Sequence, residues 1–208
     1  MYIELIDLLR CPRDHEESWL VAAFAKMEGR FVIAGRLGCH VCSASYSIRH
    51  GVADLRSVRE PDDDRRSMEA DAPAEAVAMR TAAMLNLARP GLLIVLEGSE
   101  ARASRMISEL TEARVIALNP HGQPAETERV APVLADDRFP LASASVDGIA
   151  LSTNAAEQLV ADAPRVLKPG GRLVAPAGTR LAPSFRELAR YESQLVAEIA
   201  GPLTTLTR

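Results

Sequence analysis

The feature that most restricts the fold of this chain is the alternation, after residue 73, of apolar runs with stretches of helical period. Residues 92–96 form a continuous apolar run of strand length, typical of a strand buried on both faces, and 114–118 read as a second buried strand. A weaker strand is expected at 130–134 and further strands at 146–151 and 172–175, with helices at 77–88, 103–113, 154–167 and 184–199. This alternation predicts an α/β, Rossmann-like fold whose mostly parallel sheet carries helices on both faces.

The first quarter of the chain has a different character. It holds all three cysteines, and it reads as a short helix at 3–9 followed by β-like stretches broken by glycines. A charged segment without apolar period follows at 59–67 and is the best linker candidate. We therefore expect a small α+β domain at 1–57, a linker at 58–72 and the α/β domain at 73–208.

The cysteines are spaced as in a zinc ribbon, in which two ligand pairs on tight turns close on one ion. Cys39 and Cys42 form one pair, and the second pair should lie at Cys11 and three residues later, where the chain has Asp14. The sequence therefore predicts zinc held by Cys11, Asp14, Cys39 and Cys42, with the adjacent His15 as the competing fourth ligand. The alternative is a ribbon that has lost its metal together with its fourth cysteine.

Composition excludes several classes of protein. With 24 Lys and Arg against 28 Asp and Glu, the net charge of −4 gives no global field for nucleic acid. No apolar run approaches the length that spans a bilayer, and the acidic start does not resemble a signal peptide. We expect a cytoplasmic protein without membrane contact.

The N-terminal segment resembles the zinc-ribbon proteins that activate tRNA and release-factor methyltransferases. The resemblance covers residues 1 to about 57: Leu-Leu-Arg-Cys-Pro at 8–12, the cysteine pair, then Tyr46-x-Ile48-x-x-Gly51. It departs from that pattern at Asp14, Ser47 and Ala53. It implies a zinc-ribbon fold and a methyltransferase partner.

The remainder, about residues 75 to 208, resembles class I methyltransferases that use S-adenosylmethionine. The matching motifs are Arg-Val-Leu-Lys-Pro-Gly-Gly-Arg-Leu-Val at 165–174 and Pro-Leu-Ala-Ser-Ala-Ser-Val-Asp at 140–147. That family closes its sheet with two further strands as a hairpin. Because a helix with Ser184 and Glu187 at its start is expected at 184–199, with one possible strand at 203–207, we expect a sheet trimmed at this edge.

The resemblance places the cofactor at the ends of the first strands. It implies that Glu97, Gly98 and Asn119 line the cleft, with Asp136 or Asp137 near the adenine. The family has a Gly-x-Gly-x-Gly loop and a ribose-binding carboxylate, whereas this chain has one glycine and the amide of Asn119. An amide has one acceptor oxygen and does not replace a carboxylate that accepts both ribose hydroxyls.

Two functions follow from these residues. The first is a methyltransferase-like protein with weak or lost S-adenosylmethionine binding, acting as a non-catalytic scaffold or regulator. It would work as a homodimer or beside an active methyltransferase. The second is an active S-adenosylmethionine-dependent methyltransferase on an unknown acceptor. We find no catalytic nucleophile–base pair in the sequence, and its four histidines are dispersed.

Overall fold

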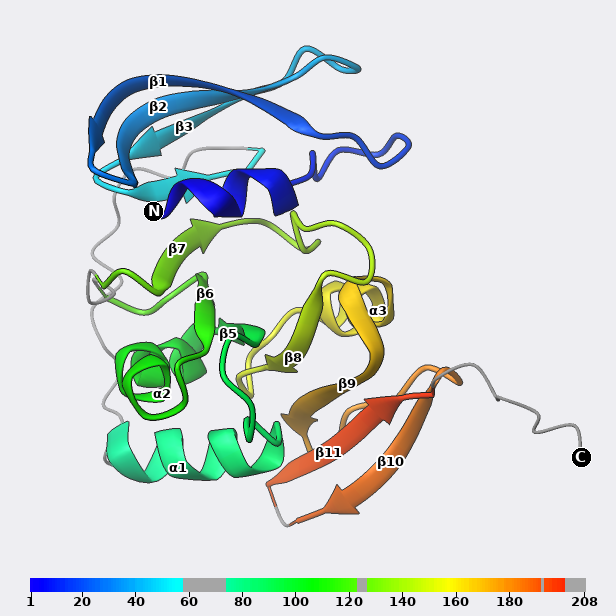
Figure 1. Ribbon diagram of the computed structural model, residues 1–208. Helices are drawn as coiled ribbons and strands as arrows, with labels where there is room; N and C mark the ends of the chain where they lie inside the picture. Colours follow the sequence, from blue (N-terminus) through cyan, green and yellow to red (C-terminus); the bar gives the residue numbers. More distant parts are fainter. Residues whose placement is uncertain (58–73, 123–126, 192, 201–208) are drawn as a thin grey trace, which may run out of the picture.

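A computed structural model describes residues 1–57, 74–122, 127–191 and 193–200, and in them eleven strands form one mixed sheet (Figure 1). The strands run in the order β1-β2-β3-β4-β7-β6-β5-β8-β9-β11-β10. Their bounds are β1 Leu20–Glu28, β2 Phe31–Cys39, β3 Ser45–Arg49, β4 Val52–Asp54, β5 Leu93–Glu97, β6 Arg114–Leu118, β7 Val130–Leu134, β8 Val146–Ala150, β9 Leu167–Pro176, β10 Phe185–Arg190 and β11 Gln194–Ile199.

The helices are short. They are the 3-10 helices η1 (Ile3–Leu8) and η2 (Gly98–Ala103) and the α-helices α1 (Ala74–Met84), α2 (Ser104–Thr111) and α3 (Glu157–Val166). Within the described part of the chain, none has both the length and the apolar character needed to cross a membrane.

The strands β5 to β9 confirm the predicted Rossmann-like order. Counted from β5, the third, second, first, fourth and fifth strands lie side by side, and every neighbouring pair among them is parallel. Alternate residues of β5 face two different cores: Leu93 and Val95 on one side, Ile94 and Leu96 on the other. Helices α1 and α2 cover the second face, and α3 and η1 pack into the first, as a doubly wound sheet requires.

The N-terminal segment is joined to this sheet by a short parallel ladder. In it, Ala53 pairs with Val133 and Asp54 with Leu134, and the N–H of Leu55 donates to the carbonyl of Leu134 at 2.8 Å. Residues 1–57 therefore share a sheet and a core with the α/β part. The predicted linker at 58–72 lies outside the described residues.

The expected helix at 184–199 is wrong. The chain there forms β10 and β11, an antiparallel hairpin in which β11 also pairs with β9. The sheet therefore has the closing hairpin, and the expectation of an edge trimmed of these two strands is wrong as well. The possible strand at 203–207 lies outside the described residues.

The start of α3 also differs from expectation. The helix predicted at 154–167 begins three residues later, at Glu157 after Ala156, without a side-chain cap. The helix ends near the expected position, at Val166.

Candidate metal centre and cofactor crevice

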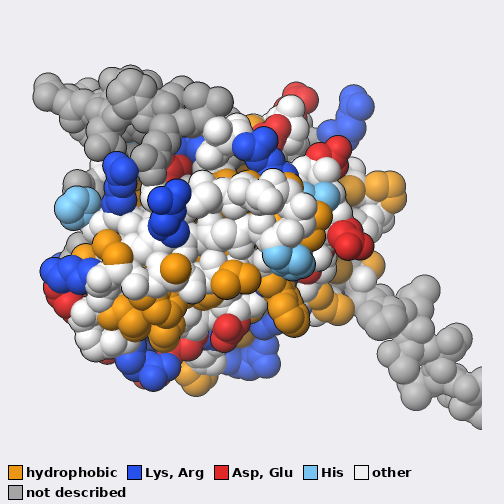
Figure 2. Space-filling model, turned by 90° about the horizontal axis from the view of Figure 1, so that it is seen from above, with side chains coloured by type: hydrophobic (Ala, Val, Ile, Leu, Met, Phe, Trp, Pro, Cys, Tyr) orange, Lys and Arg blue, Asp and Glu red, His pale blue; other side chains and the backbone are white. Residues whose placement is uncertain are grey.

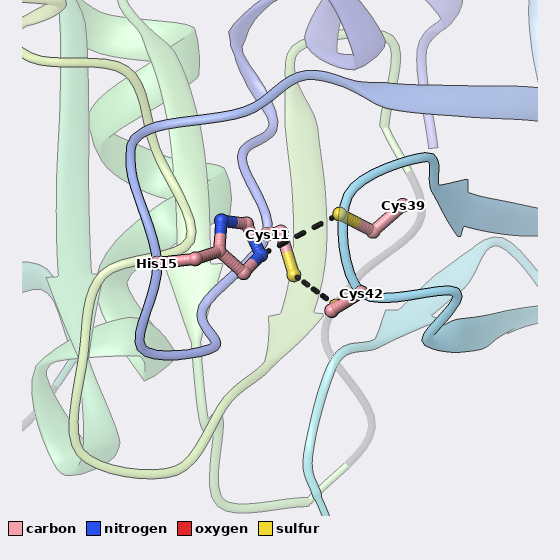
Figure 3. Close-up of side chains that lie close together, drawn as sticks. All are labelled: Cys11, His15, Cys39 and Cys42. Atoms are coloured by element: carbon pink, nitrogen blue, oxygen red, sulfur yellow. Dashed lines mark hydrogen bonds between the residues drawn. The ribbon is translucent and has the colours of Figure 1, made fainter.

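Two loops bring four metal-binding side chains together (Figure 3). The first loop leaves Cys11, carries His15 and returns at Ser18, where the N–H of Cys11 donates to the carbonyl of Ser18 at 3.0 Å. The second loop runs from Cys39, the last residue of β2, through Cys42, and the N–H of Cys39 closes it on the carbonyl of Ala44 at 2.9 Å. Each loop therefore supplies two donors from a closed turn.

The donor atoms are spaced for one ion. Those of Cys11, His15, Cys39 and Cys42 all lie within 4.8 Å of one another. The Sγ atoms of Cys11 and Cys42 are 3.7 Å apart, and Nε2 of His15 is 3.5 Å from Sγ of Cys39. In tetrahedral zinc sites, Zn–S bonds of about 2.3 Å place sulfurs about 3.8 Å apart. These four side chains could hold a metal ion.

The ring of His15 is oriented by a hydrogen bond to the backbone of the next residue, Glu16. Nδ1 lies 2.6 Å from the carbonyl oxygen of Glu16, which can only accept a hydrogen bond. Nδ1 therefore carries the hydrogen, and Nε2, the atom facing Cys39, keeps its lone pair in the neutral ring. Metal-ligating histidines are commonly fixed by such a bond on the other nitrogen.

The sulfurs differ in their surroundings. Burial raises the pKa of the Cys11 thiol to about 11, although the hydroxyl of Tyr46, 3.4 Å from its Sγ, acts in the opposite direction. Burial also acts to raise the pKa of Cys39, but the backbone N–H groups of Cys42 and Val41, together with the thiols of Cys42 and Cys11, lower this pKa to about 6. The surrounding protein thus favours the thiolate form of Cys39. At Cys11, a nearby cation is needed to stabilise the thiolate.

The structure does not bring Asp14, the predicted fourth ligand, into this cluster. Its side chain is exposed and is not one of the clustered donors, and His15 takes that place. The three-residue spacing that selected Asp14 holds for two cysteines on one tight turn. In this structure the first loop is a wider turn running from Cys11 to Ser18, and a longer imidazole one residue further on reaches the sulfurs.

The second candidate site lies where β5 and β8 end. In open α/β sheets, ligands bind outside the carboxyl ends of strands at the point where the strand order reverses, here between β5 and β8. The last residue of β5, Glu97, is buried, and its Oε2 accepts hydrogen bonds from the N–H of Ser152 at 3.1 Å and from its hydroxyl at 2.7 Å. This carboxylate oxygen therefore already accepts two hydrogen bonds from the protein itself.

Gly98 is closely surrounded at the same place. Its φ of +58° is left-handed, and a Cβ added there would lie 2.7 Å from Oγ of Ser152 and 3.9 Å from Nε2 of His121. The glycine thus permits the close packing of the β5 end against Ser152. The following turn, η2, buries Glu100, whose Oε2 accepts a hydrogen bond from Thr81 at 3.2 Å.

The other predicted cofactor residues lie at the ends of neighbouring strands and also make internal contacts. Asn119 follows β6, and its Oδ1 accepts a hydrogen bond from the N–H of Ala135 at 3.0 Å. Asp136 follows β7, and its Oδ2 accepts two hydrogen bonds of 2.7 Å from the N–H and hydroxyl of Ser57. Asp137 beside it is exposed.

Sequence reasoning missed Ser152. It lies two residues after β8, and a small hydroxyl beyond a buried strand is too common to stand out. Its signal would have been the reversal of strand order, which brings the β8 end next to the β5 end. The structure also places the ring of His121, one of the four dispersed histidines, near Gly98.

Comparison with known proteins gives structural matches only. No protein-family model matches the chain, and no curated protein sequence does. A Burkholderia thailandensis 1,6-didemethyltoxoflavin-N1-methyltransferase structure is 17% identical with a TM-score of 0.42, covering 87% of this chain and 83% of that one. A Streptomyces coelicolor geranyl diphosphate C-methyltransferase is 21% identical with a TM-score of 0.41, covering 49% and 44%.

A methyltransferase structure from Aquifex aeolicus is 13% identical with a TM-score of 0.37, covering 62% of this chain and 98% of that one. This chain covers only 45% and 60% of the lengths of two further matched structures. All of these overall similarities are low, so the fold assignment rests on the strand order given above.

Proposed function

We propose that this chain is a methyltransferase-like scaffold or regulatory partner, with a structural zinc ion in its N-terminal part and weak or absent S-adenosylmethionine binding. The observation that carries the proposal is that the crevice side chains already accept hydrogen bonds from other groups of the protein. Glu97 accepts from Ser152, Asn119 from Ala135 and Asp136 from Ser57. A cofactor would have to compete with these bonds and would find an amide where a carboxylate is needed.

The energetic consequence is large enough to matter. A missing buried polar contact costs about 1–3 kcal/mol. Loss of both the ribose carboxylate and the close glycine approach, about 2–6 kcal/mol together, corresponds to a roughly 30- to 10⁴-fold weaker complex, which takes a micromolar site toward millimolar. The chain would then keep the methyltransferase fold without useful cofactor occupancy.

Zinc is the ion that suits the N-terminal donors. Three thiolates and one imidazole form a common structural zinc set, and a closed site of four protein ligands leaves no position for substrate. Cys11, His15, Cys39 and Cys42 would hold the ion and thereby fasten the loop after η1 to the β2–β3 turn. Its role would be to stabilise the fold.

The second candidate function is an active methyltransferase. It is favoured by the Rossmann-like strand order, by the acidic Glu97 at the end of β5 and by Gly98, the one glycine that remains there. In this case His121 and Ser152 would border the methyl donor. Other residues of the chain would select the methyl acceptor.

Isothermal titration with S-adenosylmethionine and S-adenosylhomocysteine separates the two. The scaffold proposal expects no saturable heat at low micromolar ligand, from protein whose circular dichroism shows that it is folded. A dissociation constant in the low micromolar range for either ligand would overturn it and leave the enzyme. The zinc assignment is tested separately by elemental analysis, so the two parts fail independently.

A further inference from the structure

The sheet has two outer strands, and they differ in how they are protected. At one end, β10 carries Arg186, Glu187 and Arg190 in six residues, and these charges form ion pairs across its surface. Charged side chains on an edge strand oppose pairing with another chain. At the other end of the sheet, β1 has no such protection over its first half (Figure 1).

The unprotected part of β1 is the uncharged segment Leu-Val-Ala-Ala-Phe at 20–24. Its N-terminal limit is set by Arg10 and Cys11, which pair with the chain at 18–19. Its C-terminal limit is an irregularity in the β1–β2 register after Phe24, beyond which the strand carries Lys26 and Glu28. Among the described residues, none pairs with the outer edge of β1 between these limits.

Large apolar side chains are exposed along this segment. Val21 is 65% exposed and Phe24 is 42% exposed, and Trp19 just before the segment is 68% exposed. The molecule viewed from above shows apolar side chains at its surface beside charged ones (Figure 2). An exposed, apolar and uncharged edge is the usual substrate for strand addition.

We propose that the occupant of this edge is a second copy of the chain, paired antiparallel through residues 20–24 about a twofold axis at Ala22. Antiparallel self-pairing places Leu20 opposite Phe24 and Val21 opposite Ala23. Because the segment is uncharged, no like charges meet; Val21 lies opposite the small Ala23, and Leu20 and Phe24 form an apolar pair across the two strands. The irregularity after Phe24 would turn Lys26 and Glu28 away from the junction.

The two faces of such a junction would both be apolar. Leu20 points into the core and Phe24 lies on the same face, so Phe24 of each copy would extend the core over Leu20 of the other. Val21 lies on the opposite face of the strand, next to the unfilled position of Gly38 with which it pairs. The result would be one sheet running through both copies.

Sedimentation of the zinc-loaded full chain over a wide range of concentrations tests the proposal. We expect twice the mass of one chain at high concentration and dissociation on dilution. Val21→Lys, at a largely exposed position, should halve the mass at high concentration. Leu188→Lys, which adds the same charge to the half-exposed surface of β10, should leave the mass unchanged.

A second measurement does not depend on that variant folding. Ala22→Cys should form an intermolecular disulfide under mild oxidation, because Ala22 faces its own copy at the axis, whereas the parent chain should not. A single-chain mass at every concentration overturns the proposal and leaves the edge to a strand of another protein. A dimer that persists in Val21→Lys without the Ala22→Cys cross-link, or one that Leu188→Lys dissociates, overturns it too.

Discussion

Nε2 of His15 faces Sγ of Cys39 at 3.5 Å, while Nδ1 of the same ring is held by the backbone carbonyl of Glu16. If the site binds zinc, His15→Ala should lower the affinity at least tenfold, since removing even an outer partner of a ligand costs 10- to 100-fold. Competition with a chromophoric chelator measures this affinity. Asp14→Ala is the matched control and should bind zinc like the parent chain.

Purified protein should contain one zinc per chain by elemental analysis. The reverse pattern, with zinc kept by His15→Ala and lost by Asp14→Ala, would restore the sequence-based assignment. Absence of any bound divalent metal from both the parent and the control would reject the centre.

Tyr46→Phe should weaken the metal centre without removing a ligand. Burial raises the pKa of Tyr46, so its hydroxyl stays protonated and can donate to Sγ of Cys11. Loss of this bond should cost about 1 kcal/mol, or roughly fivefold to tenfold in zinc affinity. The same competition assay measures it, with Tyr191→Phe, at an exposed tyrosine, as the control. Equal affinities of the two variants would contradict the role of the hydroxyl.

Gly98→Ala should destabilise the fold by about 2–4 kcal/mol, because it adds a left-handed backbone cost to a clash with Oγ of Ser152. Gly91→Ala is the control, since Gly91 has a φ of +75° with nothing near its Cβ position. It should lose only the backbone part, about 1 kcal/mol. Urea unfolding of both variants checks the difference. Equal losses would show that the β5 end is not tightly packed.

Asn119→Asp should strengthen S-adenosylmethionine binding if the missing carboxylate limits affinity. An aspartate keeps an oxygen for the N–H of Ala135 and adds a second acceptor for ribose. We expect a tenfold or greater gain by titration, on the scale of about 1–3 kcal/mol. Asn119→Ala, which offers no acceptor, is the control. No gain in the aspartate variant would place the limit at the Gly98–Ala103 turn instead.

Limited proteolysis should cut first among residues 59–66, the charged segment between the two parts. Mapping the first fragments by mass spectrometry checks this. First cuts inside the β1–β2 hairpin or the α/β part would contradict the predicted boundary.

The central sheet could be predicted because its signal is local. The strands β5, β6 and β7 are mostly apolar, β8 and the second half of β9 carry short apolar stretches, and helices between parallel strands leave few topologies to consider. The closing hairpin was missed for an equally local reason. Phe185 and Leu188 repeat with helical spacing, and the turn near Tyr191 contains neither glycine nor proline. The continuous run Leu195–Val196–Ala197, buried on both faces, was the better indicator.

The remaining features depend on contacts between distant residues. Selection of His15 over Asp14 is decided by the shape of a loop that the Ser18 carbonyl closes, and the Glu97–Ser152 bond by the neighbouring positions of β5 and β8. Neither of these two contacts is marked by a characteristic residue spacing in the sequence. The three cysteines, the competing ligand His15 and Glu97 could be found from the sequence, whereas the preference for His15 over Asp14 and the contact of Glu97 with Ser152 required the fold.

The parallel pairing of Ala53 with Val133 has a consequence for what holds the chain together. A protease cut between the two parts would break a covalent link but leave the ladder, the shared core and the bond from Leu55 to Leu134 in place. The two fragments should run separately on a denaturing gel and travel together under native conditions. The segments before and after the cut would then behave as two subunits of a permanent complex, synthesised as one polypeptide.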